Sequence, residues 1–226
     1  MEKTMFDTLL SLPLFQGLGR ADLNRILEST HLEYEKRAGG SVIVREGDLC
    51  EGVTFVLDGK VAIENVAADG SWLVEEELPT PTAVGIESLY GSKRTYTSTC
   101  QTRSQTRLLW VDKRTIAALT AYFEVFRINL LNHLSASLSR AQQPQWLPAP
   151  DTLEGRIVAW FRAHVARPAG QKQFRLTMSL LGKYLGEDYR YISRALHNLE
   201  HQGLLSLSRN TITIPAFEQL IMHYAL

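Results

Sequence analysis

The chain has 226 residues, 45% of them hydrophobic, which is enough for one large or two modest globular domains. It contains no run of about 18 apolar residues and no signal-peptide pattern at its N-terminus, so no membrane span is indicated and we expect a cytoplasmic protein. The formal net charge is zero, but residues 1–150 carry 15 basic and 18 acidic side chains, whereas residues 151–226 carry 9 and 6.

The first half of the chain is predicted to be mainly β-structure after two short helices. Apolar residues at helical spacing predict helices over Phe6–Leu12 and Arg20–Leu27. Between His31 and Asp112, short alternating runs separated by turn residues predict a barrel or jelly roll. The expected strands are Ser41–Val44, Gly52–Leu57, Lys60–Asn65, Trp72–Glu77, Tyr96–Thr99 and Thr106–Val111.

The residues with reactive side chains in this half do not form a catalytic pattern. The run Glu75-Glu76-Glu77 lies on one expected strand and is interpreted as a solvated edge rather than a catalytic pair. Cys50 and Cys100 are too widely spaced for a zinc site, so we expect buried free thiols, with a redox switch as the alternative. No nucleophile elbow, phosphate-binding loop or metal-ligand motif occurs, so the sequence predicts no catalytic residues, no metal and no enzyme.

The longest helical pattern runs from Asp112 to Ala141, without glycine or proline. As one helix it would be about 45 Å long. A helix of this length with a sustained apolar face usually packs against a partner helix, which favours dimerisation. Burial of the face against the strands of its own chain is the alternative. The residues expected to form this face are Leu119, Phe123, Phe126, Leu130, either His133 or Leu134, and Leu138.

A proline-rich segment separates this helix from the rest of the chain. Gln142–Pro150 contains three prolines in nine residues and cannot continue a helix, so we expect a hinge there. A further helix is predicted from Asp151 or Thr152 to Val165, and a short strand over Phe174–Leu176.

Two short helices joined by a tight turn follow. Met178–Leu185 has helical spacing with Thr177 as a predicted N-cap, and Gly186 ends the pattern. Asp188 is the predicted N-cap of a second helix. One face of that helix is apolar and the other is basic and hydrogen-bonding, which is what a helix in the DNA major groove needs. The apolar residues are Ile192, Ala195, Leu196 and Leu199, and the polar residues are Tyr189, Arg190, Ser193, Arg194 and His197.

Two alternating runs after these helices predict a β-hairpin. They are Leu204–Ser208 and Thr211–Ile214, with Arg209 at the tip. A helix-turn-helix followed by a hairpin is the winged arrangement, in which the tip touches backbone phosphate. A helical pair with a solvated basic face is the alternative interpretation. Ala216–Leu226 is expected to close the chain as a small helix.

The segment LGKYLGEDYRYISRALHNLEHQGLL, with Gly186, Tyr189-Arg190, Ser193-Arg194, Leu196 and Leu199 in register, resembles the DNA-binding domain of the CRP/FNR family of bacterial transcription regulators. The stretch from Val42 to Val61 is similar to the β-roll of cyclic-nucleotide-binding domains. The resemblance implies an α+β protein with an N-terminal double-stranded, jelly-roll-like β-roll, a long dimerisation helix and a C-terminal winged helix-turn-helix. The expected boundaries are 1–112 for the effector domain, 113–141 for the dimerisation helix, 142–150 for the hinge and 151–226 for the DNA-binding domain.

This resemblance assigns DNA contacts and a dimer interface. Tyr189 and Arg190 stand where the family commonly has an Arg-Glu pair, so the familiar operator half-site is not expected. The residues expected to read bases are Tyr189, Arg190, Ser193 and Arg194, and those expected to contact phosphates are Lys183, His197 and Arg209. The residues expected at the dimer interface are Leu119, Phe123, Phe126, Leu130, His133 and Leu134.

The resemblance also points to a ligand site in Thr82–Thr97. Nucleotide-binding members have a Gly-Glu step for the ribose and an Arg followed by a small polar residue for the cyclic phosphate. Here Ile86 follows Gly85, and the glutamate comes one residue later, which turns its carboxylate away from the expected side. The expected effector residues are Gly85, Glu87, Arg94 and Thr95. A cyclic nucleotide, another small anionic effector and no effector remain open.

The functional prediction is a homodimeric regulator that reads a palindromic operator on double-stranded DNA. Gating by a small ligand in the β-roll, which need not be a cyclic nucleotide, is one of the options left open, and RNA polymerase is a further expected partner. The alternative is an effector-sensing module that acts through protein contacts without specific DNA binding.

Overall fold

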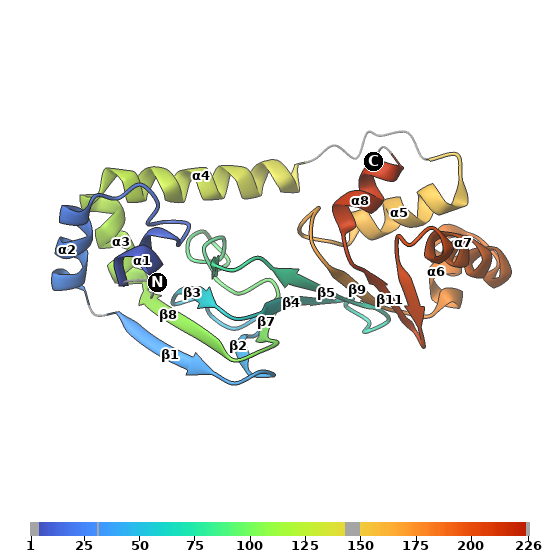
Figure 1. Cartoon of the computed structure of the whole chain (residues 1–226), viewed down its shortest axis with the longest axis horizontal. Helices are drawn as coiled ribbons and strands as arrows, with labels where there is room; N and C mark the ends of the chain where they lie inside the picture. Colours follow the sequence, from blue (N-terminus) through green and yellow to red (C-terminus); the bar gives the residue numbers. More distant parts are fainter. Residues whose placement is uncertain (1–4, 31, 143–149, 225–226) are drawn as a thin grey trace. The chain divides into compact units, whose positions relative to one another are not determined.

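The computed structural model describes residues 5–30, 32–142 and 150–224 (Figure 1). The chain divides into two compact units, the first comprising Met1–Ala62 and Leu78–Gln142, the second Ile63–Glu77 and Gln143–Leu226. The second unit therefore contains a hairpin from the middle of the strand-rich region as well as the C-terminal part of the chain. The expected hinge lies almost entirely in residues 143–149, which are outside the described residues.

The first unit is a β-roll flanked by helices, as expected. One sheet has the strand order β1-β8-β3-β6. In the second sheet, β2 pairs antiparallel with β7. The helices and strands of this unit are α1 (Met5–Leu10), α2 (Arg20–Ser29), β1 (Glu33–Arg37), β2 (Val42–Val44), β3 (Gly52–Asp58), β6 (Thr82–Val84), β7 (Thr99–Thr102), β8 (Thr106–Asp112), α3 (Lys113–Tyr122) and α4 (Glu124–Ala141).

The strands differ from the prediction at three places. β1 and β6 were not predicted, because Glu33–Arg37 is largely charged and Thr82–Val84 is only three residues long. The expected strand over Tyr96–Thr99 is wrong, since β7 begins only at Thr99. Tyr96 instead exchanges backbone hydrogen bonds with Gly47 and Asp48, outside the named strands.

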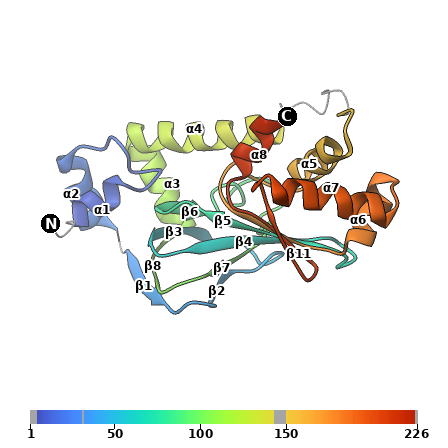
Figure 2. The same ribbon diagram turned by 45° about the vertical axis from the view of Figure 1, so that its right-hand side comes forward.

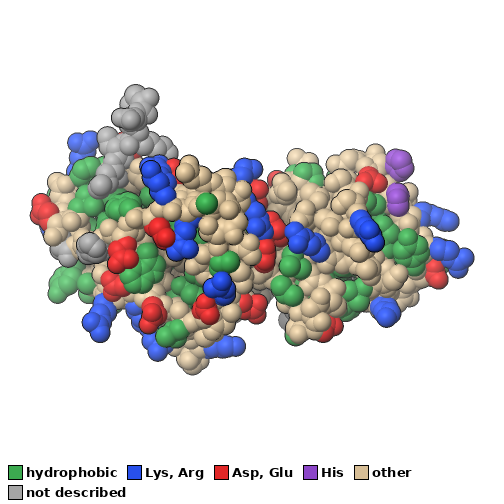
Figure 3. Space-filling view, turned by 90° about the horizontal axis from the view of Figure 1, so that it is seen from below, with side chains coloured by type: hydrophobic (Ala, Val, Ile, Leu, Met, Phe, Trp, Pro, Cys, Tyr) green, Lys and Arg blue, Asp and Glu red, His purple; other side chains and the backbone are tan. Residues whose placement is uncertain are grey.

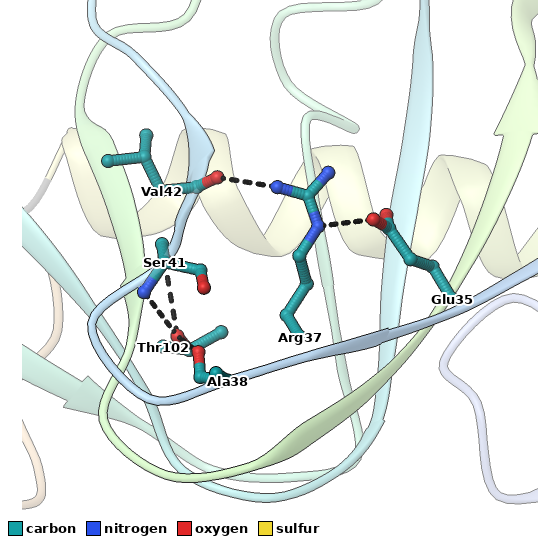
Figure 4. A network of polar contacts seen from close by, with 6 residues as sticks. All are labelled: Glu35, Arg37, Ala38, Ser41, Val42 and Thr102. Carbon is teal, nitrogen blue, oxygen red and sulfur yellow. Dashed lines mark hydrogen bonds and ion pairs between the residues drawn. The ribbon is translucent and has the colours of Figure 1, made fainter.

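A buried threonine joins the first turns of the roll. The Thr102 hydroxyl donates to the Ala38 carbonyl over 2.6 Å and accepts from the Ser41 amide over 2.9 Å (Figure 4). The Arg37 guanidinium next to it donates to the Val42 carbonyl over 3.3 Å. These contacts satisfy backbone groups that the β1–β2 turn would otherwise leave without partners.

The single long helix expected from Asp112 to Ala141 is broken at Phe123, so that prediction is wrong. Phe123 has φ −118° and ψ 106°, and it ends α3 and begins α4. Its ring packs against the core of the first unit, as do residues on both sides of the break, so tertiary packing overrides a sequence without helix breakers. With 18 residues, α4 is about 27 Å long instead of the expected 45 Å.

Three aromatic rings mark the centre of the first core. The Phe15 ring meets those of Phe55 and Phe126 edge-on, with centroids 5.4 and 5.2 Å apart, an arrangement that aromatic pairs prefer. Leu119, Phe126 and Leu130 are all buried in this same core. Much of the apolar face predicted for dimerisation is therefore used within the chain.

The second unit is a winged helix-turn-helix with an added hairpin (Figure 2). The neighbouring strands follow the order β10-β11-β9-β5-β4. The division between the units falls near the start of β4 and the end of β5. The helices and strands are β4 (Val61–Val66), β5 (Leu73–Leu78), α5 (Leu153–Ala163), β9 (Lys172–Arg175), α6 (Met178–Leu185), α7 (Tyr189–His201), β10 (Ser206–Ser208), β11 (Thr211–Ile214) and α8 (Phe217–His223).

The acidic run on β5 was predicted to be a solvated edge, and this is wrong for Glu76. Its side chain has no exposed surface and lies 3.0 Å from the ammonium of Lys172, which is equally buried. Strand alternation turns Glu75 and Glu77 to the opposite face, where both remain partly exposed. The partner on β9 is almost a hundred residues away in sequence, so local sequence patterns did not reveal it.

Candidate nucleic-acid interface

Local signals in the sequence define both helices of the helix-turn-helix. The Thr177 hydroxyl accepts from the Leu180 amide over 3.1 Å and caps α6, as predicted. Gly186 ends α6 with φ +69°, a left-handed conformation that glycine adopts without steric cost. The Asp188 carboxylate accepts from the Arg190 amide over 2.9 Å and caps α7. Both helix boundaries predicted from the sequence are thus confirmed.

The turn between the helices depends on a second glycine. A Cβ atom on Gly182 would lie 2.6 Å from the Glu187 carbonyl oxygen, so any larger residue would push the turn away from α6. The Glu187 carboxylate forms an ion pair with Arg156 of α5. These contacts set the direction in which α7 leaves the turn.

Helix α7 has one buried and one exposed face, as its sequence predicts. Four apolar side chains on the inner face are buried in the core of the second unit, together with Phe161 and Phe174. The predicted DNA-contacting residues lie on the outer side: Tyr189, Arg190, Arg194 and His197 are exposed, and Ser193 is half-buried. The buried inner residues are Ile192, Ala195, Leu196 and Leu199.

Two of the outer side chains are held by local contacts. The Arg190 guanidinium donates to the Asp188 carboxylate over 3.0 Å, and hydrogen bonds from Arg190 hold the pKa of Asp188 below its usual value. Both groups are exposed to solvent, so this pair is weak and the guanidinium can exchange it for another acceptor. The His197 ring nitrogen Nδ1 lies 2.7 Å from the Ser193 carbonyl oxygen.

A groove of about 380 Å³ lies between the start of α6, the start of α7 and the wing. Tyr189 and Arg209 both line it, so the structure brings a predicted base-reading residue and the predicted wing-tip residue to one cavity. Asn210 at the wing tip has φ +56°, a conformation that asparagine tolerates better than most residues. Thr177 and Ser179 also line the groove and were not predicted as contacts; their position at the start of α6 is the signal that could have revealed them.

The remaining predicted phosphate contact, Lys183, is exposed on α6. Figure 3 shows Lys and Arg side chains protruding from the part of the second unit that carries α6 and α7, with few acidic side chains among them. This matches the excess of three basic residues counted in residues 151–226. An exposed basic surface attracts the phosphate backbone, although an excess of three charges is modest.

In the first unit, the predicted effector residues differ in their exposure and in the groups that they contact. Gly85 has φ +99°, and a Cβ there would meet Tyr96 at 3.0 Å and the Cys50 sulfur at 3.3 Å. Ile86 is buried in the core, so the residue after Gly85 is a buried apolar side chain and not the expected glutamate. Arg94 is exposed and Thr95 is partly buried. Tyr96 and Cys50, which were not predicted, are the side chains closest to Gly85.

Glu87 is directed to α4. Its carboxylate lies 2.9 Å from the His133 ring nitrogen Nε2 and accepts from the Ser137 hydroxyl over 2.9 Å. Burial raises the pKa of Glu87, but hydrogen bonds from His133 and Ser137 and the charge of His133 outweigh it and lower this pKa to about 2. The residue predicted to hold an effector therefore ties the loop after β6 to the helix predicted to form the dimer.

The predicted dimer residues divide into two sets. Leu119, Phe126 and Leu130 are buried within their own chain and cannot face a partner, which corrects their assignment to the interface. Phe123 and Leu134 are partly buried against the same core, and His133 contacts Glu87. A different set of apolar residues from the end of α3 and along α4 is exposed: Tyr122, Val125, Ile128, Leu131 and Leu138.

Both cysteines are buried free thiols, as predicted. The Cys50 thiol donates to the carbonyl oxygens of Gly52 and Gly85, at 3.3 and 3.4 Å. Among the described residues, no group of three His, Cys, Asp or Glu side chains could hold a metal ion. No helix in the described part of the chain is both long and apolar enough to cross a membrane.

Comparison with known proteins assigns both halves of the chain. A family model described as a cyclic nucleotide-binding domain matches residues 35–122, and one described as a Crp-like helix-turn-helix domain matches residues 155–222. The chain is similar to the catabolite activator protein of Thermus thermophilus, with 22% identity over 94% of this chain and 98% of that one and a TM-score of 0.52.

It is also similar to a putative transcriptional regulator of the crp/fnr family from Eubacterium rectale, with 18% identity over 95% of this chain and 98% of that one and a TM-score of 0.52. A search of curated proteins found no match. At these identities the two structures establish the fold, whereas the two family models match the effector and DNA-binding halves separately. The chain therefore combines a cyclic nucleotide-binding domain with a Crp-like helix-turn-helix domain, as transcription regulators of the CRP/FNR family do.

Proposed function

We propose that the protein is a homodimer that reads a palindromic operator through helix α7. The observation that carries this proposal is the capped, two-faced α7, whose inner face is buried and whose outer face presents Tyr189, Arg190 and Arg194. Arg side chains read guanine through two parallel hydrogen bonds, and a helix with a fixed back can hold them in register with the bases. Because its target would be chromosomal DNA, we expect the protein in the cytoplasm.

Dimerisation is proposed through the exposed apolar side chains of α4, chiefly Ile128, Leu131 and Leu138. These residues follow one another at three and seven positions, so they lie close to one stripe of the helix. Each of these side chains is more than two-fifths exposed, so a second copy that covers them removes apolar surface from water and stabilises the dimer. A two-fold dimer also presents two recognition helices, which compensates for the small positive charge of each DNA-binding domain.

For the effector, the geometry favours a ligand other than a cyclic nucleotide. The place of the ribose-binding glutamate is taken by the buried Ile86, and the neighbouring Glu87 is engaged by α4. We therefore propose that Glu87 transmits changes between the loop after β6 and α4 instead of holding a ribose. RNA polymerase is a further proposed partner, as expected for a transcription regulator. A sensing module without DNA binding is the second candidate, and the two-faced α7 argues against it.

Replacing Arg194 with alanine should weaken operator binding by about 1–3 kcal/mol and relax the preference at one base pair of each half-site. Replacing Arg209 should weaken binding equally for all DNA sequences. It should also reduce the slope of log affinity against log salt concentration by about one. Fluorescence anisotropy on the operator and on single-base variants of it would measure both effects. Arg25→Ala, which removes the same charge from α2, is the control and should leave binding unchanged. Equal behaviour of the Arg194 and Arg25 variants would contradict the assignment of α7.

Cyclic AMP and cyclic GMP should produce no saturable heat when titrated into the wild-type protein in a calorimeter. The expected reason is the apolar Ile86 at the position that would need a ribose acceptor. The Arg94→Ala variant, titrated in parallel, serves as the control for the phosphate contact. Saturable binding that disappears in this variant would show that the cassette holds a cyclic nucleotide despite its altered sequence.

The Glu87→Gln variant should unfold more easily than the wild type at pH 7, by about 1 kcal/mol once solvent screening of this half-exposed side chain is included. The folded-state pKa of Glu87 lies below its ordinary value of 4.5, so its stabilising effect is present above about pH 4.5 and is lost as the pH falls toward 2. Urea denaturation at pH 7, 5 and 3 would measure the difference, with Ser137→Ala as the variant that removes only one donor. A difference that stays constant across this range would refute the ionised contact.

A further inference from the structure

The β4–β5 hairpin contributes a strand to the sheet of the DNA-binding unit. β5 pairs antiparallel with β9, with Leu73 opposite Arg175 and Glu76 opposite Lys172. Because β11 pairs with the other side of β9, the hairpin makes β9 an interior strand. Without it, the backbone of β9 would be left as an unpaired edge.

The hairpin also contributes to the core of this unit. Val74 has no exposed surface and packs in the same cluster as Phe161 and Phe174. Trp72 meets the Trp160 ring edge-on at 6.0 Å and the His164 ring at 4.8 Å, so it covers the end of α5. Removing the hairpin would expose these apolar surfaces to water.

The tip of the hairpin reaches the first helix of the helix-turn-helix. The Ser71 hydroxyl lies 3.1 Å from the Tyr184 hydroxyl of α6. The Tyr184 ring is stacked on that of Trp160, with centroids 5.5 Å apart. The hairpin is therefore in contact with α5, β9 and α6, and α7 packs on this same framework.

A buried carboxylate fixes the hairpin in this position. Glu76 lies 3.0 Å from the Lys172 ammonium and accepts from the backbone amides of Ala166 and Arg167, at 2.7 and 3.1 Å. The Lys172 ammonium also donates to the Ala169 carbonyl over 2.8 Å. Burial lowers the pKa of Lys172, and the Glu76 charge offsets this only in part. The carboxylate thus holds both the strand β9 and the loop that connects α5 to it.

The position of Glu76 also fixes the register of the two strands. A slip of one residue would turn Glu76 to the other face of the sheet and bring Glu75 or Glu77 inward without the same partners. It would also turn Val74 out of the core. Only the observed register satisfies the apolar cluster and the buried charges together.

We propose that the β4–β5 hairpin is a permanent part of the DNA-binding unit, and that Glu76 is the positioning residue that keeps it there. Residues 63–77 then move with α7 whenever the unit moves. The unit is joined to the β-roll through β4 and β5 as well as through the chain that follows α4. A change in the roll reaches the recognition helix directly through β4 and β5. This inference rests on the proposed function only in taking α7 as the helix that reads DNA.

The first test is a charge cycle in the full-length chain, made of Glu76→Gln, Lys172→Met and the double variant. Each single change leaves one buried group without its partner, so the melting temperature should fall by roughly 5–15 °C. Operator affinity, measured where the protein is still folded, should fall about tenfold or more. The double variant should recover most of both losses because no unpaired charge remains. Glu33→Gln, at an exposed position of β1, removes the same charge, is the matched control and should change neither quantity.

The second test locks the hairpin with a disulfide between Cys residues at 75 and 173, in the variant Glu75→Cys, Gln173→Cys. These two positions are direct partners across the β5–β9 ladder. The crosslink should form readily under mild oxidation, and the oxidised protein should bind the operator within about twofold of the reduced protein.

Three outcomes would overturn the proposal. They are a double variant no better than the single variants, a failure of the crosslink to form, and a crosslink that abolishes DNA binding. The last would mean that the hairpin must leave β9 before DNA binds. If the wild-type protein binds no DNA at all, the proposed function fails, while crosslinking and the stability cycle still test the hairpin on their own.

Discussion

One buried ion pair, between Glu76 and Lys172, decides how the DNA-binding half of this chain is built. Burying two charges is costly, and removing one partner of such a pair typically destabilises a protein by about 3–5 kcal/mol. Here two backbone amides and a carbonyl complete the hydrogen bonds of the pair, so every polar atom that burial strips of water has a protein partner. Because the two residues come from distant parts of the chain, the pair also requires that the middle of the sequence and its C-terminal third fold together.

The helix-turn-helix is organised on the resulting sheet and core. Local caps define where α6 and α7 begin, and the apolar inner face of α7 defines which side chains remain for DNA. In the β-roll, by contrast, the buried Ile86 stands where a nucleotide-binding relative would have a carboxylate. The Glu87 carboxylate instead accepts a hydrogen bond from Ser137 of α4. The winged helix-turn-helix therefore presents an exposed polar helix face, whereas the Glu87 carboxylate of the β-roll makes its contacts within the chain.

The sequence predicted the DNA-binding elements well because their signals are local. Thr177, Gly186 and Asp188 mark helix ends within a few residues, and the structure confirms all three. Features set by long-range packing were not predictable in this way: α3 and α4 separate at Phe123, which no helix-breaking residue announces, and Leu119, Phe126 and Leu130 turn to their own core instead of a partner. Glu76 was misjudged for the same reason, since three consecutive glutamates are usually solvated and nothing near them in sequence indicates Lys172.

The proposed function requires that two copies of α7 read one operator together. Selection of bound fragments from a pool of random double-stranded DNA tests this most directly, because it assumes neither the sequence nor the number of half-sites. We expect one enriched motif made of two inverted half-sites, with centres about one helical turn (about 10 base pairs) apart. Enrichment of a single half-site without an inverted copy would contradict the dimer, and no enrichment at all would contradict the DNA-binding function itself.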